Sequence, residues 1–548
     1  MIKLAITCLL TVCSSFMFAQ INGAPGSLTS PFDAQSPDRF SDIEPYDYGH
    51  NVRFFYPEKD VEVLQRSPEG KPLAFKAEVP QDEHLTWEQK ADLWLADAAE
   101  LMRIENAELT FKKRDLWTDA QGTTHMRLDQ YHNGAKVFGA EIILHSEGGK
   151  WAMQNGPFVP QFQLPILARS AGMNTRQLKE VVISELENYQ ENWQVKSDLP
   201  FKEVEQWTDE PIYYNHEGNY RLSHHFLVMP NMKNRYEYIV DASTGEVLNQ
   251  WSTTCQLHHE HTGACTHAHT DDQKPLSSGP TTANAQDLLG TNRVINTFEE
   301  NGTFFLIDGS RASYNPSLSS IPDEPIGAIW TIDIGGQSPI NSNASFRQIT
   351  SGSNNWSSTR EGVSAHYNAG EAYEYFERVH GRNGITGDGQ TIVSVVNVTN
   401  EDGSSMGNAF YNSLAIWYGN GDNTFFPLGR ALDVAGHELT HGVVENTANL
   451  IYQNESGAMN ESFADIFGAM IDRDDWLIGE DVVRPGVFPG GALRSLSDPH
   501  NGANFQDLAR GWQPSHYDER FRGRRQWGSP HQQWHTQSRL LQICAGRG

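Results

Sequence analysis

The sequence is short of cysteine and of basic residues, and beyond its N-terminal segment it has no long hydrophobic run. Among 548 residues there are 5 Cys, and 41 Lys and Arg stand against 69 Asp and Glu, a formal net charge of -28. A nucleic-acid partner would need basic patches, so this balance argues against that class of partner. The lack of a later apolar run predicts a protein without a membrane span. The acidity itself is typical of a solubilising surface.

The first residues carry the pattern of a secretory signal. The segment "MIKLAITCLLTVCSSFMFAQ" has a Lys, then an apolar run, then small residues, and it is too short to cross a membrane. Cleavage after Ala19 fits the preference for small residues at such sites. A short buried helix is the alternative interpretation, but we expect a signal peptide and a secreted protein.

The length predicts three or four domains at roughly 150 residues each. The first half of the chain mixes helix and strand patterns. In "LTWEQKADLWLADAAELMRI", Thr86 and Gln89 form a capping box ahead of one apolar helical face. The Asn-Gly pair at 133–134 predicts a tight hairpin. A second helix over 174–189 precedes further strands, and this half holds nothing that resembles a catalytic cluster.

The segment 255–285 breaks this pattern, because it is polar, turn-rich and carries five His within twelve residues. A metal-binding tract is one interpretation, but no regular ligand spacing appears, which favours an exposed linker. Such a linker ahead of a different domain is where a protease would cut. A bridge between Cys255 and Cys265 is plausible in an oxidising compartment.

The second half changes composition and then becomes helical. From about 286 to 425 it is rich in Gly, Asn, Ser and Thr with short apolar runs, which favours a β-rich lobe. Helical patterning returns over 360–381 and most strongly at 431–448, "ALDVAGHELTHGVVENTA".

The helix predicted at 431–448 contains a metal-binding pattern. His437 and His441 are four residues apart and share one helical face, so both can bind one zinc ion. Glu438 is rotated by about 100° from His437 and can instead reach a zinc-bound water. Downstream, Glu461 can be the third ligand, and Asp465 can accept the free ring N–H of His437. An ordinary solvated helix face is the alternative for these two acids.

The stretch "GHELTHGVVENTANLIYQNESGAMNESFADIFG" resembles the active-site region of the thermolysin-like metalloproteases. The match extends upstream to "GNAFYNSLAIWYGNGDNTFFPLGRALDVAGHELTH" and downstream to "ALRSLSDP", and it covers roughly residues 290 to 523. Residues 50 to 250 are similar to the family's propeptide, an FTP (fungalysin/thermolysin propeptide) module followed by a PepSY module. The resemblance implies a zinc-dependent neutral endopeptidase, made as a zymogen, that prefers bulky apolar residues just after the cut bond.

The resemblance also implies roles for single residues. It makes His437, His441 and Glu461 the zinc ligands and Glu438 the general base, which takes the proton of a zinc-activated water. It makes Tyr452 a donor to the oxyanion.

Substrate and calcium residues follow from the same resemblance. Asn408 and Ala409 would bind the substrate backbone as an added strand, and Arg494 would bind the carbonyl beside the scissile bond. The family's structural calcium site has four matching residues, and one further acidic position is occupied by Leu477, so a single calcium ion is expected. The four are Asp433, Asp472, Asp475 and Glu480.

One motif of the family is missing. Its "DNGGVHxNSG", which supplies a His as a second oxyanion donor, should follow about 30 residues after "ALRSLSDP". That position holds "RRQWGSPHQQWHTQSRLLQIC", where His531 and His535 lie in no matching context.

A one-base shift of reading frame accounts for the missing motif. If Arg525 to Trp534 are encoded CGA CAA TGG GGG AGT CCA CAT CAA CAG TGG, the same DNA read one base later spells Asp-Asn-Gly-Gly-Val-His-Ile-Asn-Ser, then a Gly. Trp has one codon, so Trp527 and Trp534 each force a Gly in the shifted frame, and both fall on motif glycines. We expect one inserted base near Gly523 and an impaired enzyme; an unrelated natural tail is the alternative.

The expected fold class is α+β, with α+β propeptide modules ahead of a two-lobe catalytic domain whose zinc-binding helix lies between a β-rich lobe and a truncated helical lobe. The expected partners are protein and peptide substrates and the chain's own propeptide. The rival function is a catalytically dead secreted pseudoenzyme or a protease-inhibitory, propeptide-like binding protein. The expected segments are a signal peptide at 1–19, a loose leader at 20–50, the FTP-like module at 51–165, the PepSY-like module at 166–252, a linker with the maturation site at 253–285, the β-rich lobe at 286–430, the incomplete helical lobe at 431–523 and the out-of-frame tail at 524–548.

Overall fold

The computed structural model describes residues 61–67, 70–119, 121–165, 172–188, 207–256, 278–341, 344–505 and 507–515. The expected signal, the leader, most of the His-rich linker and the chain from 516 onward lie outside these residues. By its internal contacts the chain divides into two compact units. The first comprises 1–185, 209–226 and 238–250, and the second comprises 186–208, 227–237 and 251–548.

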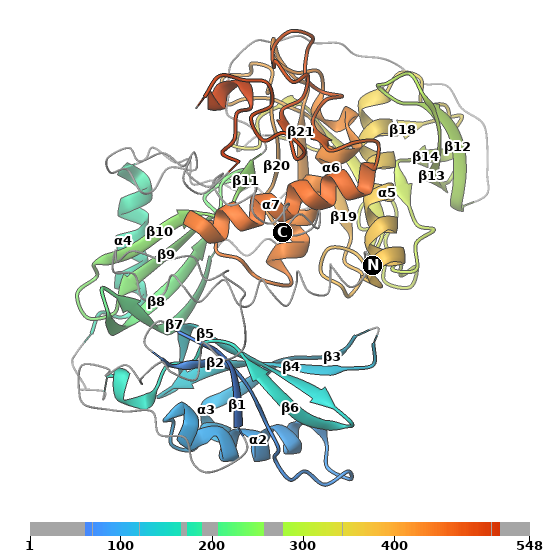
Figure 1. Cartoon of the computed structure of the whole chain (residues 1–548). Helices are drawn as coiled ribbons and strands as arrows, with labels where there is room; N and C mark the ends of the chain where they lie inside the picture. Colours follow the sequence, from blue (N-terminus) through green and yellow to red (C-terminus); the bar gives the residue numbers. More distant parts are fainter. Residues whose placement is uncertain are drawn as a thin grey trace. The chain divides into compact units, whose positions relative to one another are not determined.

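The N-terminal part is built on a sheet of ten described strands in the order β1-β2-β6-β5-β7-β8-β9-β10, with β4 paired to β5 and β3 to β4 (Figure 1). The strands are β1 Val61–Arg66, β2 Pro72–Ala77, β3 Phe111–Thr118, β4 Thr124–His132, β5 Ala135–Glu147, β6 Lys150–Asn155, β7 Trp207–His216, β8 Asn219–Val228, β9 Tyr236–Asp241 and β10 Val247–Ser252. The helices are α2 Trp87–Met102, α3 Ala107–Thr110 and α4 Thr175–Asn188.

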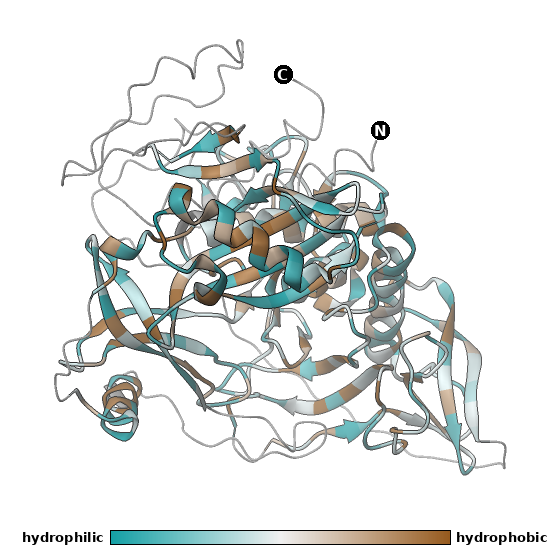
Figure 2. Cartoon of the chain, turned by 90° about the horizontal axis from the view of Figure 1, so that it is seen from below, coloured by the Kyte–Doolittle hydropathy of each residue, from teal (hydrophilic) through white to brown (hydrophobic). Residues whose placement is uncertain are grey.

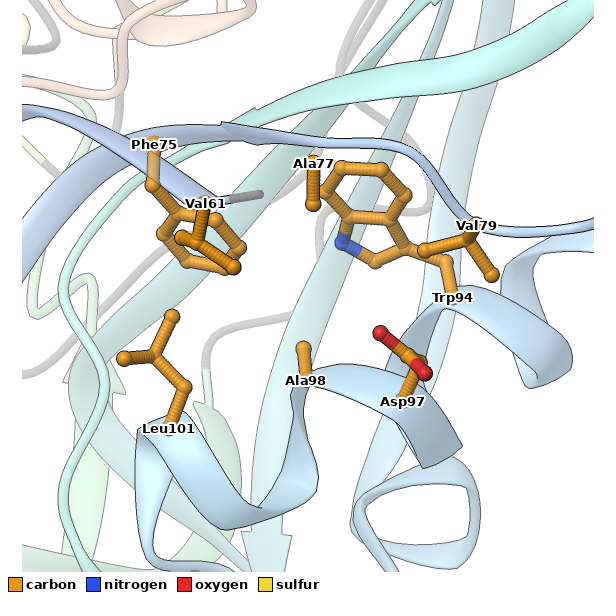
Figure 3. A pocket seen from close by; sticks show the side chains of 8 residues that line it. All are labelled: Val61, Phe75, Ala77, Val79, Trp94, Asp97, Ala98 and Leu101. Carbon is orange, nitrogen blue, oxygen red and sulfur yellow. The ribbon is translucent and has the colours of Figure 1, made fainter. Parts of the chain in front are cut away.

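Local sequence signals account for two of these elements. The predicted capping box is confirmed, since Thr86 accepts from the Gln89 backbone and the Gln89 side chain accepts from the Thr86 backbone at the start of α2. The predicted hairpin joins β4 to β5, and its turn residues Asn133 and Gly134 have φ of 47° and 86°, the left-handed region that an Asn-Gly turn tolerates. The apolar face of α2 packs on β1 and β2, where Trp94 and Leu101 point toward Phe75 (Figure 3).

The second unit carries the two longest described helices, α5 and α7. Its main sheet has the order β11-β20-β21-β19-β16-β15 with β17 on β16, and a smaller sheet has the order β12-β13-β14-β18. The strands are β11 Cys255–Gln256, β12 Gly279–Gln286, β13 Asn292–Glu300, β14 Thr303–Phe305, β15 Ile307–Asp308, β16 Ile329–Gln337, β17 Arg347–Gln348, β18 Thr350–Ser351, β19 Ile392–Val398, β20 Ala409–Tyr411, β21 Ile416–Gly419, β22 Leu477–Ile478 and β23 Arg494–Ser495. The helices are α5 Arg360–His380, α6 Leu432–Glu445 and α7 Asn454–Asp472.

The helices α6 and α7 lie side by side at very close range (Figure 1). Two glycines permit this approach. A Cβ atom on Gly468 of α7 would lie 2.7 Å from the Asp433 carbonyl oxygen, and one on Gly436 of α6 would lie 2.8 Å from the side chain of Ile471. The glycines therefore bring one turn of α6 against one turn of α7, where the predicted metal residues stand.

The expected mixed α+β class is confirmed, with a β-rich part ahead of α6 and a helical part that begins with it. The structure differs from the expected linker at both ends, because β11 lies before residue 257 and β12 begins at Gly279. The strand β12, "GPTTANAQ", consists mostly of small and polar residues. It therefore has little hydrophobic alternation, and it forms by pairing along β13. Hydrophilic and hydrophobic residues are mixed along the ribbon (Figure 2). Among the described helices, none is long and apolar enough to cross a membrane.

Candidate metal centre

The two motif histidines lie on the face of α6 that meets α7, and both are buried. The rings of His437 and His441 meet edge to face with centroids 4.6 Å apart. Their Nε2 atoms are 3.0 Å apart. Glu461 lies on α7. Its Oε2 atom is 3.6 Å from Nε2 of His437, and its Oε1 atom is 3.6 Å from Nε2 of His441. The structure thus brings together the three predicted ligands, with their ligand atoms all within 4.8 Å of one another.

Two acceptors on α7 fix how the imidazoles are protonated. Oδ1 of Asp465 lies 2.8 Å from Nδ1 of His437, and Oδ1 of Asn460 lies 2.8 Å from Nδ1 of His441. Because both partners are acceptors, each Nδ1 carries the hydrogen and each Nε2 presents a lone pair to the centre of the group. Asn460 was not anticipated from the sequence, although a second histidine ligand needs an acceptor as much as the first.

The donor set fits a cation. Burial lowers the pKa of both histidines, that of His441 to about 4, so the rings are neutral. Two lone pairs 3.0 Å apart repel each other unless a positive ion lies between them. Oε2 of Glu461 is buried and makes no hydrogen bond to any residue that the structure describes. Two imidazoles and one carboxylate are the ligand set of a catalytic zinc site with an open position.

Asp465 also anchors an arginine. Nε and Nη2 of Arg494 donate to its two carboxylate oxygens at 2.8 and 2.6 Å, and all these groups are buried. Burial alone would raise the pKa of Asp465, but Arg494 and the hydrogen bond from His437 outweigh it and hold the pKa well below its usual value. The carboxylate therefore stays ionised, and Arg494 is fixed beside the metal group.

Glu438 stands next to the ligands without a committed partner. It is fully buried, and neither carboxylate oxygen has a well-formed hydrogen bond within the described chain. Burial raises the pKa of Glu438 well above its usual value, Glu461 adds to the rise, and Arg494 and the Tyr411 backbone act against it. A carboxylate with a raised pKa and free oxygens can accept and return a proton.

Tyr452 reaches the same group. Its hydroxyl donates to Oε1 of Glu461, and its ring lies 5.9 Å from that of His441. Burial first, and then the negative charge of Glu461, raise the pKa of Tyr452 well above its usual value. The phenol therefore remains a hydrogen-bond donor.

The predicted substrate residues lie at β20. Asn408 and Ala409 are both buried, and β20 pairs through one edge with β21. Its other edge is occupied by β11, a short strand that was expected to be linker. Cys255 in β11 is a buried free thiol. Cys265, the partner suggested for it, lies outside the described residues.

A second group of acidic residues lies where the first turn of α6 meets the last turn of α7. Ligand oxygens of Asp433, Asp472 and Glu480 lie within 4.8 Å of one another. Asp475, the fourth predicted calcium residue, is exposed and is not part of this group. Burial and the neighbouring carboxylates raise the pKa of Asp472 to about 6 and that of Glu480 to about 7. The three acids can hold a cation, and oxygen ligands suit calcium.

Comparison with known proteins gives concordant matches. Residues 282–445 match the catalytic domain of thermolysin metallopeptidases, 448–545 match their alpha-helical domain, and 110–158 match the fungalysin/thermolysin propeptide motif. Thermolysin of Bacillus sp. (strain EA1) is 31% identical over 429 residues, covering 76% of this chain and 69% of that protein. Bacillolysin of Brevibacillus brevis is 31% identical over 432 residues, covering 78% and 69%.

One solved structure also matches in part. The precursor of protealysin, a metalloproteinase from Serratia proteamaculans, has a TM-score of 0.34 and 27% identity over 39% of this chain and 68% of that chain. The family assignment rests on the sequence matches, which span propeptide motif, catalytic domain and helical domain. The chain belongs to the thermolysin family of metalloendopeptidases.

Proposed function

We propose that the protein is a secreted, zinc-dependent neutral endopeptidase made as a zymogen. The observation that carries the proposal is the buried group of His437, His441 and Glu461 with the uncommitted carboxylate of Glu438 beside it. These three ligands would hold the zinc. When bound, zinc polarises the substrate carbonyl and acidifies a water molecule.

In this proposal Glu438 moves the protons. It takes one from the water as the oxygen attacks the amide carbon, and it delivers one to the nitrogen as the C–N bond breaks. Its raised pKa favours a group that both accepts and donates in one cycle. Tyr452, kept protonated, donates to the oxygen that becomes negative in the transition state.

Substrate would lie along β20 as an added strand. Asn408 and Ala409 would bind its backbone, and Arg494, held by Asp465, would donate to the carbonyl beside the cut bond. The preference for bulky apolar residues after the cut rests on the family resemblance. One calcium ion, bound by Asp433, Asp472 and Glu480, would stabilise the ends of α6 and α7.

Residues 51 to 252 would act as an intramolecular chaperone and inhibitor, with the FTP-like module ahead of the PepSY-like one. Maturation would cut between about 253 and 290, ahead of the catalytic domain. N-terminal sequencing of the secreted protein locates the cut. Adding the propeptide in trans to mature enzyme at micromolar concentration should slow peptide hydrolysis, and unchanged rates would contradict inhibition.

The sequence from 524 to 548 would be an out-of-frame reading of the segment that supplies the second oxyanion donor. Loss of one such donor costs on the order of a hundred- to a thousand-fold in turnover, so we expect zinc binding but little hydrolysis until one base is removed near codon 523. The match to the helical domain runs through this segment to residue 545. Sequencing the gene across codon 523 decides the matter, and an intact frame would refute the shift.

The missing donor motif favours one rival, a secreted pseudoenzyme that binds proteases or peptides without cleaving them. A casein assay on the purified chain separates the endopeptidase from the pseudoenzyme. The assay is run with and without removal of zinc by a chelator, and the frame-restored chain is assayed in parallel. Hydrolysis that stops when zinc is removed and returns when zinc is added back supports the endopeptidase. Zinc-loaded, frame-restored, propeptide-free protein that leaves casein intact would establish the pseudoenzyme.

A further inference from the structure

The strand β11 occupies the edge of β20 that the proposed function gives to substrate. Cys255 is paired with Tyr411 and Gln256 with Phe410 in antiparallel register. An added strand on this edge is how an extended peptide would bind. The chain thus places a piece of itself, from the start of the segment expected to contain the maturation cut, where a substrate backbone would lie.

The register turns the Cys255 side chain toward the metal helix. Residues directly opposite each other in an antiparallel pair lie on the same face of the sheet, so Cys255 and Tyr411 share a face. Tyr411 points at α6, because a Cβ atom on Gly442 would lie 2.9 Å from its hydroxyl oxygen. Gly442 follows the ligand His441 in sequence. The thiol therefore faces the helix that carries both histidines, and Cys255 is 5% exposed.

The charges around the thiol belong to the metal site. After burial, the groups that raise the pKa of Cys255 most are the carboxylates of Glu461 and Glu438. The charge of Cys255 in turn affects Tyr452. Oxygens of both glutamates are buried without hydrogen-bond partners in the described chain. Among the described residues the sulfur has one long contact, 3.9 Å to the carbonyl oxygen of Thr253, and it lies outside the group of His437, His441 and Glu461 whose ligand atoms are within 4.8 Å of one another.

A neighbouring loop fixes the segment that leads into Cys255. Thr253 donates its backbone N–H to the Arg235 carbonyl at 2.8 Å, and Thr254 donates its hydroxyl to the Lys233 carbonyl at 2.9 Å. Arg235 in turn forms an ion pair with Glu445 at the end of α6, with 2.5 Å between Nη1 and Oε1. The position of Cys255 is thus set from α6 itself.

The same loop is tied to the substrate edge. The Asn412 amide, directly after β20, donates to the Met232 carbonyl at 2.6 Å. The hydroxyl of Ser413 donates to Glu445, whose carboxylate oxygens lie 2.7 and 2.8 Å away. Segments 232–235 and 253–256 are therefore held together on one end of β20 and α6, and neither is a loosely attached tail.

We propose that Cys255 is the latch of the zymogen, with its thiolate as the fourth ligand of the zinc held by His437, His441 and Glu461. On metal binding, the thiol would give its proton to solvent and its sulfur would move into the fourth position, which a water molecule would otherwise occupy. Thiolate is a strong zinc ligand, and a site with three protein ligands leaves one position for it. A maturation cut after Gln256 would release the latch together with β11. The proposal rests on the proposed zinc site.

The test uses the full chain as zymogen, with Glu438→Gln to prevent self-cleavage, loaded with Co²⁺ in place of zinc. We expect near-ultraviolet absorption from thiolate-to-cobalt charge transfer. This absorption should be lost in Cys255→Ser and kept in Cys265→Ser, the matched control in the same linker. A band that survives Cys255→Ser, or cobalt bound without any band, would overturn the latch. Failure of cobalt to bind, or binding unaffected by His437→Ala, would instead overturn the metal site and so the proposed function.

A second measurement needs no change at Cys255. X-ray absorption of the zinc-loaded zymogen should show one sulfur at about 2.3 Å beside nitrogen and oxygen ligands at about 2.0–2.1 Å. The sulfur shell should vanish after the propeptide is cut and removed. A first shell of nitrogen and oxygen alone in the uncut chain would contradict the proposal, even if the Cys255→Ser variant failed to fold.

Discussion

Oδ1 of Asp465 lies 2.8 Å from Nδ1 of His437, and this bond joins the two helices that carry the ligands. The same carboxylate holds Arg494 through two hydrogen bonds. One buried side chain therefore orients His437, a proposed zinc ligand, and fixes the guanidinium of Arg494 beside it. Its ionised form is secured by both partners, since they lower the pKa of Asp465 against the effect of burial.

Changing Asp465→Asn should weaken zinc binding by about 10- to 100-fold, the usual cost of losing an acceptor behind a histidine ligand. It should also destabilise the fold by roughly 3–5 kcal/mol, because Arg494 would be left buried without its counter-charge. Competition against a chelator measures the first and thermal unfolding the second. The exposed Asp474→Asn in the loop after α7 is the control and should change neither. Unaltered zinc affinity in the Asp465 variant would show that His437 is oriented by something else.

Calcium should stabilise the chain through three carboxylates. At a free calcium concentration 100 times Kd, the free energy of unfolding should rise by about 2.7 kcal/mol. Asp472→Asn should remove most of this gain, because it breaks the clustered group of ligand oxygens. Asp475→Asn is the matched change outside that group and should keep most of it. Equal losses in the two variants, measured by thermal unfolding with and without calcium, would place Asp475 among the ligands.

A histidine pair in the N-terminal unit should make its stability depend on pH. Nδ1 of His145 lies 2.8 Å from Nδ1 of His125, and Nε2 of His145 lies 2.6 Å from Oδ1 of Asn155. Burial lowers the pKa of His145 below its usual value, with a further contribution from His125. The folded state thus favours neutral His145, so its contribution is complete above about pH 6.5, the unfolded value, and is lost as pH falls through the lower folded value.

Between about pH 7.5 and pH 5 the thermal midpoint of the chain should therefore fall more steeply than in His145→Gln. His84→Gln, at an exposed site, serves as the control and should follow the unmodified chain. Parallel curves for the unmodified chain and His145→Gln would exclude His145 as the cause.

Local patterns predicted single elements well. The capping box of Thr86 and Gln89 and the Asn133-Gly134 turn need no distant partner, so they can be read from a few adjacent residues. The spacing of His437 and His441 likewise fixes their common face once a helix forms. Glu461 and Asp465 could also be predicted, because they lie four residues apart on a second helix.

Features that depend on tertiary contact were missed. Asn460 lies in a stretch of α7 where every residue fits a helix, and only its approach to His441 reveals its role. The strand β11 is two residues long, so it has no periodicity to detect, and its pairing with β20 is decided by the fold. Asp475 stays a predicted calcium ligand: it is exposed, its Oδ1 accepts from the Leu477 backbone at 2.6 Å, and its oxygens are not among those clustered in the acidic group.

The most direct test of the endopeptidase is Glu438→Gln in the frame-restored enzyme after removal of the propeptide. Zinc content and casein hydrolysis are measured together, with Glu377→Gln on the exposed face of α5 as the control. Because the three ligands remain, the Glu438 variant should bind one zinc ion per chain yet lose about 10²- to 10⁴-fold in turnover, the contribution of a general base. The control should match the parent enzyme. Near-normal hydrolysis by zinc-loaded Glu438→Gln protein would contradict the role assigned to this carboxylate and the mechanism built on it.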